Sequence, residues 1–156
     1  MALKEGDKVP DFTLPASGGR EVSLASLKGK PFVLYFYPKA DTPGCTKEAQ
    51  GFQEKLSEFQ KLGVAVIGVS RDPLRAIDKF AEKYGITFPL ASDEAGTLSE
   101  AFGTWVEKSM YGKKYMGMER STFLIDGTGR IARAWHKVKV TGHVAEVLAA
   151  AKALAG

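Results

Sequence analysis

The sequence predicts an α/β fold in which a central mixed sheet is flanked by helices. Two apolar runs with strand character, residues 32–37 and 64–69, are separated by a segment with helical spacing. A further pair of strand-like runs, 121–125 and 130–135, lies near the C-terminal end. No linker, repeat or low-complexity segment divides the 156 residues, so we expect one domain over 1–156.

The N-terminal region predicts a β-hairpin that extends this fold. Residues 11–14 and 21–24 alternate between apolar and polar side chains around Ser17-Gly18-Gly19. The first main strand then follows at 32–37, where Pro38 ends it.

The next segment predicts a helix that begins at Thr42-Pro43. Thr42 suits the N-cap and Pro43 the first helical position, while Gly63 ends the helix. Its apolar residues recur at helical spacing: Ala49, Phe52, Leu56, Phe59 and Leu62.

After the strand at 64–69, Asp72-Pro73 opens a helix that ends before Gly85. Residues 87–90 predict a short strand at a sheet edge, because Pro89 cannot donate to a ladder on both sides. Ser92-Asp93 then caps a short helix that runs through Phe102.

The C-terminal part predicts a hairpin followed by a helix. Asp126-Gly127-Thr128-Gly129 is a turn between the strands 121–125 and 130–135, and an alanine-rich helix spans 141–154. The whole order, with its N-terminal hairpin, is that of a thioredoxin-like fold with added segments.

Composition and charge exclude several classes of protein. The apolar fraction of 44% and charged fraction of 26% are ordinary for a globular protein, and no stretch is apolar enough for a membrane span. The 22 basic and 18 acidic residues are interspersed, which argues against nucleic acid as a partner. The N-terminus lacks the apolar core of a signal peptide, and one cysteine suits a reducing compartment, so we expect a cytoplasmic location.

The densest basic and aromatic stretch is residues 108–118. Our first interpretation is a solvated loop with some aromatic packing. The functional alternatives are a docking surface for a protein reductant or, with less support, a single-strand binding patch.

Cys45, the only cysteine, is the candidate nucleophile. It falls at the third position of the helix that begins at Thr42-Pro43, where unpaired N–H groups and the helix dipole favour a negative charge. A thiol there should ionise more easily than a free one. The alternative is a buried structural cysteine, but a polar strand-to-helix junction is where α/β folds expose catalytic groups.

Two motifs resemble the peroxiredoxins, in particular the branch of bacterioferritin comigratory protein and peroxiredoxin Q. Pro38, Thr42 and Cys45 match the proline, threonine and peroxidatic cysteine, and Arg120 precedes the second signature at 121–126. The resemblance implies a peroxidase that reduces hydrogen peroxide and organic hydroperoxides at Cys45. It further implies that Thr42 and Arg120 shape the peroxide site, that Pro38 shields it, and that no cofactor or metal is needed.

Many members of this branch carry a resolving cysteine five residues after the peroxidatic one, and others carry it on the following helix. Those places correspond here to Gln50 and Ala81, so no internal thiol can resolve the oxidised cysteine. Oxidised Cys45 must therefore be reduced by an external thiol, such as thioredoxin, glutaredoxin or a small thiol, or form a disulfide with a second copy. We expect a monomer or a weak homodimer.

Three rival functions use the same residues differently. A redox sensor would use the Cys45 thiolate with slow turnover, and a thioredoxin-like binding module would use the 111–118 loop without Cys45. A cysteine–histidine hydrolase is disfavoured, because neither His136 nor His143 has a motif relation to Cys45. The same three residues form no metal-ligand cluster.

Overall fold

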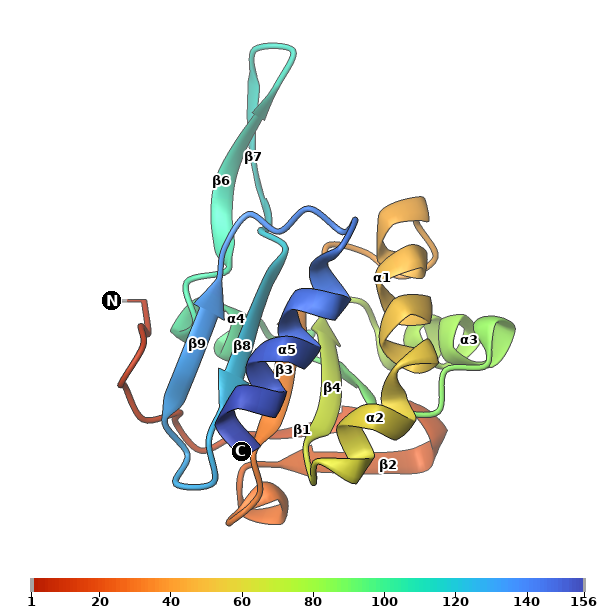
Figure 1. Ribbon diagram of the computed structural model, residues 1–156. Coiled ribbons are helices and arrows are strands. Elements are labelled where there is room, and N and C mark those ends of the chain that lie inside the picture. Colours follow the sequence, from red (N-terminus) through yellow and green to blue (C-terminus); the bar gives the residue numbers. More distant parts are fainter. Residues whose placement is uncertain (1, 156) are drawn as a thin grey trace.

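The computed structural model describes residues 2–155 and contains a seven-stranded mixed sheet in the order β2-β1-β5-β4-β3-β8-β9 (Figure 1). The strands of this sheet are β1 (Thr13–Ala16), β2 (Arg20–Ser23), β3 (Phe32–Phe36), β4 (Ala65–Ser70), β5 (Leu90–Ser92), β8 (Ser121–Ile125) and β9 (Ile131–Trp135). The α-helices are α1 (Pro43–Glu54), α2 (Leu56–Lys61), α3 (Leu74–Tyr84), α4 (Thr97–Ala101) and α5 (His143–Ala155), and two short 3₁₀ turns, Ser17–Gly19 and Ala25–Leu27, flank β2.

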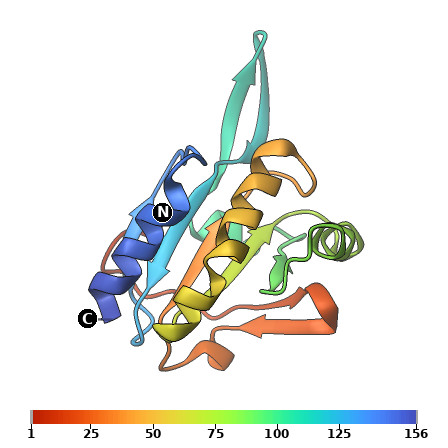
Figure 2. The same cartoon turned by 45° about the vertical axis from the view of Figure 1, so that its right-hand side comes forward.

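Strand β3 is the centre of the sheet, and all five of its residues are buried. It runs parallel to β4 and antiparallel to β8. Because side chains alternate along a strand, Val33 and Tyr35 enter one apolar cluster with residues of α1, α2, α3 and α5. Leu34 and Phe36 enter a second cluster with residues of α4 on the opposite face. Helices therefore flank both faces, as predicted, and Figure 2 shows α1 and α5 side by side on one of them.

The N-terminal hairpin is confirmed, with β1 and β2 paired antiparallel around the turn at Ser17–Gly19. It joins the main sheet through a bridge between Ala16 and Ala91 of β5. The prediction of an edge strand at 87–90 is therefore wrong, because β5 lies between β1 and β4. Pro89 precedes the strand, so its missing N–H removes no ladder bond, and the amide of Leu90 donates to Oγ of Ser17 at 3.0 Å.

The helix predicted up to Gly63 is two helices that meet at Lys55. Lys55 has φ −98° and ψ 5°, which interrupts the helical backbone between Glu54 and Leu56. The break leaves Leu56 and Phe59 in the same apolar cluster as Phe52 of α1. Helix α4 is also shorter than predicted, although the carboxylate of Asp93 accepts hydrogen bonds from the amides of Leu98 and Ser99 as a cap.

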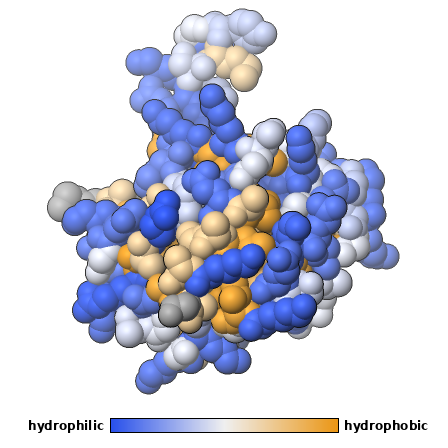
Figure 3. Space-filling view, viewed as in Figure 1, coloured by the Kyte–Doolittle hydropathy of each residue, from blue (hydrophilic) through white to orange (hydrophobic). Residues whose placement is uncertain are grey.

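The solvated loop expected at 108–118 is instead part of a second, two-stranded sheet. Strands β6 (Trp105–Met110) and β7 (Lys113–Met118) pair antiparallel and form a hairpin that projects from the body of the molecule (Figures 1 and 3). Its base is held by the Arg71 guanidinium, 3.9 Å from the Trp105 ring centroid, and by burial of Met118. The sequence shows no clear alternation of apolar and polar residues here, because the side chains far from the base of the hairpin have no core to face.

The C-terminal hairpin of β8 and β9 and the final helix α5 follow the predicted order. Within residues 2–155, no helix is long and apolar enough to cross a membrane.

Candidate active site

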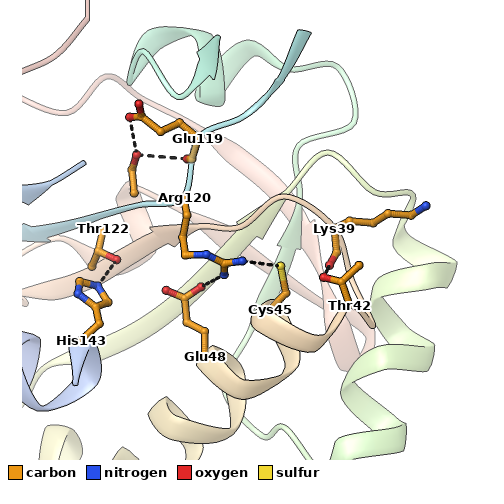
Figure 4. A network of polar contacts seen from close by, with 9 residues as sticks. Lys39, Thr42, Cys45, Glu48, Glu119, Arg120, Thr122 and His143 are labelled. Atoms are coloured by element: carbon orange, nitrogen blue, oxygen red, sulfur yellow. Dashed lines mark hydrogen bonds and ion pairs between the residues drawn. The ribbon is translucent and has the colours of Figure 1, made fainter. Parts of the chain in front are cut away.

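The junction between β3 and α1 forms the floor of the site. Thr42 occupies the N-cap position with extended backbone angles, and Pro43 is the first helical residue, as predicted. The Thr42 hydroxyl, however, donates to the carbonyl oxygen of Lys39 at 2.8 Å and makes no side-chain cap to the helix (Figure 4). The side chain thus closes the loop before α1 and leaves its oxygen lone pairs available as acceptors.

Cys45 lies in the first turn of α1, and its side chain is 1% exposed. The sequence argument expected an exposed thiol, and this expectation is wrong. The same face of α1 that carries Ala49 and Phe52 turns Cys45 toward the apolar cluster under the helix. Its sulfur is nevertheless not enclosed by hydrocarbon alone, because a charged group reaches it from the sheet.

That group is Arg120, which directly precedes β8. Its Nη2 donates to Sγ of Cys45 at 3.4 Å, so two residues distant in the sequence meet at one point (Figure 4). Gly44 permits this approach, because a Cβ at that position would lie 3.0 Å from the same Nη2. The contact places a fixed positive charge and a hydrogen-bond donor directly beside the sulfur.

Glu48 is a further member of the site that the sequence argument missed. Its Oε1 accepts a hydrogen bond of 2.7 Å from Nη1 of Arg120, and its side chain has no exposure. The other carboxylate oxygen, Oε2, has no hydrogen-bond partner among the described residues. The available signal was its spacing, since a residue three positions after Cys45 lies on the same face of a helix.

The three groups influence one another's charge. Burial raises the pKa of Glu48 to about 7, although the charge and hydrogen bond of Arg120 act to lower it. Burial also acts to lower the pKa of Arg120, but Glu48 and Cys45 together raise it above its usual value. Arg120 therefore remains a cation between Glu48 and Cys45, and Glu48 changes its protonation near neutral pH.

The segment that follows β9 covers the backbone of Arg120. The amide of Val138 donates to the carbonyl oxygen of Arg120 at 2.9 Å. His143, at the start of α5, is buried and shares a hydrogen bond of 2.8 Å between its Nε2 and Oγ1 of Thr122. Burial lowers the pKa of His143. The imidazole ring of His143 therefore hydrogen-bonds to β8 and not to the Cys45 sulfur.

Pro38 lies in the loop between β3 and α1 and is exposed. Its role as a shield for the sulfur stays a prediction. His136 approaches Oε2 of Glu119 through Nδ1 at 3.3 Å, and residues 2–155 hold no group of three or more His, Cys, Asp or Glu side chains that could bind a metal.

Comparison with known proteins shows which family this chain belongs to. Residues 5–134 match the model of the AhpC/TSA family. The chain belongs to that family. It is 49% identical over 148 residues to peroxiredoxin Bcp of Bacillus subtilis, covering 95% of this chain and 94% of the relative. It is 44% identical to peroxiredoxin Bcp of Escherichia coli over 141 residues, covering 90% of each chain.

Solved structures agree with this assignment to the AhpC/TSA family. Peroxiredoxin Q of Xanthomonas campestris superimposes with a TM-score of 0.91 at 47% identity, over 99% of this chain and 98% of its own. The resemblance to the Bcp and peroxiredoxin Q branch and the thioredoxin-like fold are therefore confirmed. As a peroxiredoxin, the protein is a thiol-dependent peroxidase.

The single cysteine distinguishes this AhpC/TSA member from some of its relatives. The X. campestris protein has been solved with serine in place of either of two cysteines. If Cys45 corresponds to the first of these two cysteines, the same spacing along the chain places the second at Ala81 on α3. Ala81 is buried and carries no thiol.

Proposed function

We propose that this peroxidase reduces hydrogen peroxide and organic hydroperoxides through Cys45, with Arg120, Thr42 and Pro38 shaping the site around the sulfur. The observation that carries the proposal is the 3.4 Å contact between Nη2 of Arg120 and Sγ of Cys45. The cysteine is the only one in the chain. Alkyl peroxide reduction is named for the X. campestris bacterioferritin comigratory protein, which is 46% identical to this chain.

The chemistry begins with the Cys45 thiolate, which attacks one oxygen of the peroxide. The S–O bond forms as the O–O bond breaks, so Cys45 becomes a sulfenic acid and the peroxide becomes water or an alcohol after taking up one proton. Negative charge moves from the sulfur to the leaving oxygen. The Arg120 guanidinium can donate hydrogen bonds to both, which stabilises the transition state.

Thr42 and Pro38 act on the peroxide from the α1 side of the site. The Thr42 hydroxyl is already oriented by Lys39, and its free lone pairs can accept a hydrogen bond from the peroxide O–H. Pro38 has no N–H and offers a rigid apolar surface that excludes competing donors.

An external thiol completes the cycle, because Gln50 and Ala81 stand where relatives carry a resolving cysteine. A thiol R–SH attacks Sγ of the sulfenic acid, and a mixed disulfide and water form. A second thiol then reduces the mixed disulfide and regenerates Cys45. We propose thioredoxin, glutaredoxin or a small thiol as the reductant, with no nucleic acid partner.

The organisation that supports this cycle is one thioredoxin-like domain over residues 1–156, acting as a monomer or a weak homodimer. A lone thiol that cycles through sulfenic acid needs a reducing environment, so we propose that the protein works in the cytoplasm.

The test is mass spectrometry of Cys45 after one equivalent of hydrogen peroxide, followed by turnover with thioredoxin, glutaredoxin and dithiothreitol. We expect a gain of one oxygen at Cys45 and multiple turnovers with at least one thiol, while Cys45→Ser consumes no peroxide. Oxidation without turnover would instead indicate a redox sensor. An unmodified Cys45 would refute the proposal.

A further inference from the structure

The end of the molecule where β3 stops and α1 begins carries more than the reactive sulfur. The β6–β7 hairpin projects from this same end, and β7 leads through Glu119 into Arg120 (Figure 1). We call this region the site end.

Exposed lysines surround the site end. Five of them come from four separate segments and have no carboxylate at ion-pair distance among residues 2–155: Lys39, Lys47, Lys113, Lys137 and Lys139. Among the nearby carboxylates, Asp41 pairs with Lys83 and Glu107 pairs with Lys114, while Glu119 shares a hydrogen bond with His136. The site end therefore presents unbalanced positive charge to a partner.

The tip of the hairpin adds apolar surface to this charge. Its large side chains are exposed by 56% at Met110, 97% at Tyr111, 45% at Tyr115 and 51% at Met116. Methionine and tyrosine supply adaptable contact area and are enriched at protein interfaces. An isolated two-stranded hairpin has no core of its own, so these residues contribute little to folding.

Tyr111 occupies a turn position at which a tyrosine is unusual. It has φ 52°, and the next residue, Gly112, has φ 76°. Two-residue turns with this backbone favour asparagine, aspartate or glycine, and a bulky side chain in the left-handed region is strained. An almost fully exposed tyrosine at this position therefore indicates use of the side chain outside the fold.

A hollow that Cys45 does not line extends along α1, and its lining includes Lys47, one of the five lysines. It has a volume of about 630 Å³ and lies between α1 and the start of α5, lined by residues that include Lys47, Gln50, Thr141 and Val144. The hairpin and the hollow together extend the contact area at the site end.

We propose that the hairpin tip and the lysines of the site end form the docking surface for a protein thiol reductant whose contact face is acidic and partly apolar. The inference rests on the proposed function, because a chain with one cysteine must receive its reducing sulfur from outside. That sulfur has to reach Sγ of Cys45, so a protein that delivers it must cover the site end. The partner's thiol attacks the sulfenic sulfur, releasing water, and its second thiol then displaces Cys45 as a thiol and leaves the partner oxidised to a disulfide.

A single-stranded nucleic acid would also be attracted by lysines and tyrosines. The structure favours the protein, because Met110 and Met116 offer no stacking face and because only a reductant needs to contact the end that holds the sulfur.

The experiment compares turnover by two kinds of reductant. Steady-state peroxide reduction is measured with thioredoxin and its reductase, with glutaredoxin and glutathione, and with dithiothreitol. We expect the double variants Lys113→Glu/Lys139→Glu and Tyr111→Ser/Met116→Ser to lower kcat/KM for the effective protein reductant about tenfold or more, since charge reversal and loss of exposed anchors act on docking. Turnover with dithiothreitol and the yield of sulfenic acid should be unchanged.

The matched control is Lys28→Glu/Lys30→Glu, which makes the same charge change in the loop at the opposite end of β3. It should leave all rates near those of the wild type. Higher salt should lower kcat/KM of the wild type for the protein reductant toward the value of the lysine variant.

Several outcomes would overturn the proposal. One is that the wild type and both double variants have equal kcat/KM for the protein reductant. Another is that the variants lose as much activity with dithiothreitol as with the protein reductant. A third is that the wild type turns over with dithiothreitol but with neither protein. Hairpin-dependent binding of a single-stranded oligonucleotide with unchanged reductant kinetics would assign the surface to nucleic acid instead. Absence of sulfenic acid in the wild type would refute the proposed function itself, which is a separate result.

Discussion

Glu48 and Arg120 form a buried ion pair in which Nη1 of Arg120 donates to Oε1 of Glu48 at 2.7 Å, while the glutamate side chain has no exposure. The same guanidinium reaches the Cys45 sulfur through its other nitrogen. Glu48 therefore fixes the orientation in which Arg120 meets the Cys45 sulfur. Protonation of Glu48 removes the negative charge that Arg120 faces on this side.

The first prediction concerns the stability of Glu48→Gln. Burial raises the pKa of Glu48 from 4.5 to about 7, so the folded state binds more protons than the unfolded state between these values. The free energy of unfolding of the wild type should then fall as pH rises from about 4.5 to about 7, by at most about 3 kcal/mol. Glu48→Gln has no carboxyl group to titrate and should lack this fall.

The measurement is urea unfolding of both proteins at a series of pH values. The difference between the two curves isolates Glu48, because His143, whose lowered pKa acts in the opposite direction, is present in both. A difference that does not change with pH would contradict the raised pKa.

The second prediction is that Arg120→Lys loses more peroxidase activity than its change in thiol ionisation explains. A lysine keeps the charge but cannot donate in two fixed directions to Glu48 and to the sulfur. We expect kcat/KM for peroxide to fall about 100-fold, the range for loss of one preorganised donor. Ultraviolet absorbance of the thiolate across pH gives the ionisation, and equal changes in both quantities would argue against transition-state stabilisation by Arg120.

The third prediction separates the two roles open to Thr42. Thr42→Val removes the hydroxyl that donates to Lys39, whereas Thr42→Ser retains it. We expect about a tenfold or greater loss of peroxide kcat/KM for valine and near wild-type activity for serine, because one hydrogen bond to the reacting group is at stake. Thermal unfolding of both variants controls for closure of the loop, and equal activity of the two would show that the hydroxyl takes no part in peroxide reduction.

Sequence patterns predicted those elements whose signals are local. The turn residues at 126–129, the Thr42-Pro43 helix start and the apolar run of β3 depend on neighbours a few positions away, and each lies where it was expected. The placement of Cys45 at the third helical position follows for the same reason.

The failures depend on contacts between distant residues. β5 is internal because the N-terminal hairpin adds to its free side, and no pattern within 87–92 contains that information. The side chains at the tip of β6–β7 have no core to face, so alternation in the pattern is weak. Burial of Cys45 depends on how α1 packs against the apolar cluster, and the part played by Glu48 depends on Arg120, which reaches it from the start of β8.

The fourth prediction tests how a cysteine at position 50 would meet Cys45. Both positions lie on α1, where five residues of helix separate Cα atoms by about 9 Å, more than the roughly 7 Å that a disulfide allows. The side chains also point in directions about 140° apart. A disulfide in Gln50→Cys therefore requires the first turns of α1 to unwind. We expect the oxidised variant to lose about one to two turns of helical circular dichroism and to exchange amide hydrogens faster over residues 43–50, with the reduced form unchanged.

The control for this prediction is Glu54→Cys, at the exposed C-terminal end of the same helix. A thiol there is too far along α1 to reach Cys45, so peroxide should leave this variant as a sulfenic acid or an intermolecular disulfide, with its helix intact. If Gln50→Cys formed the intramolecular bond and kept the full dichroism of α1, the helix would have to bend without unwinding. In that case the first turn, together with the Arg120 contact that it carries, would persist through the whole redox cycle.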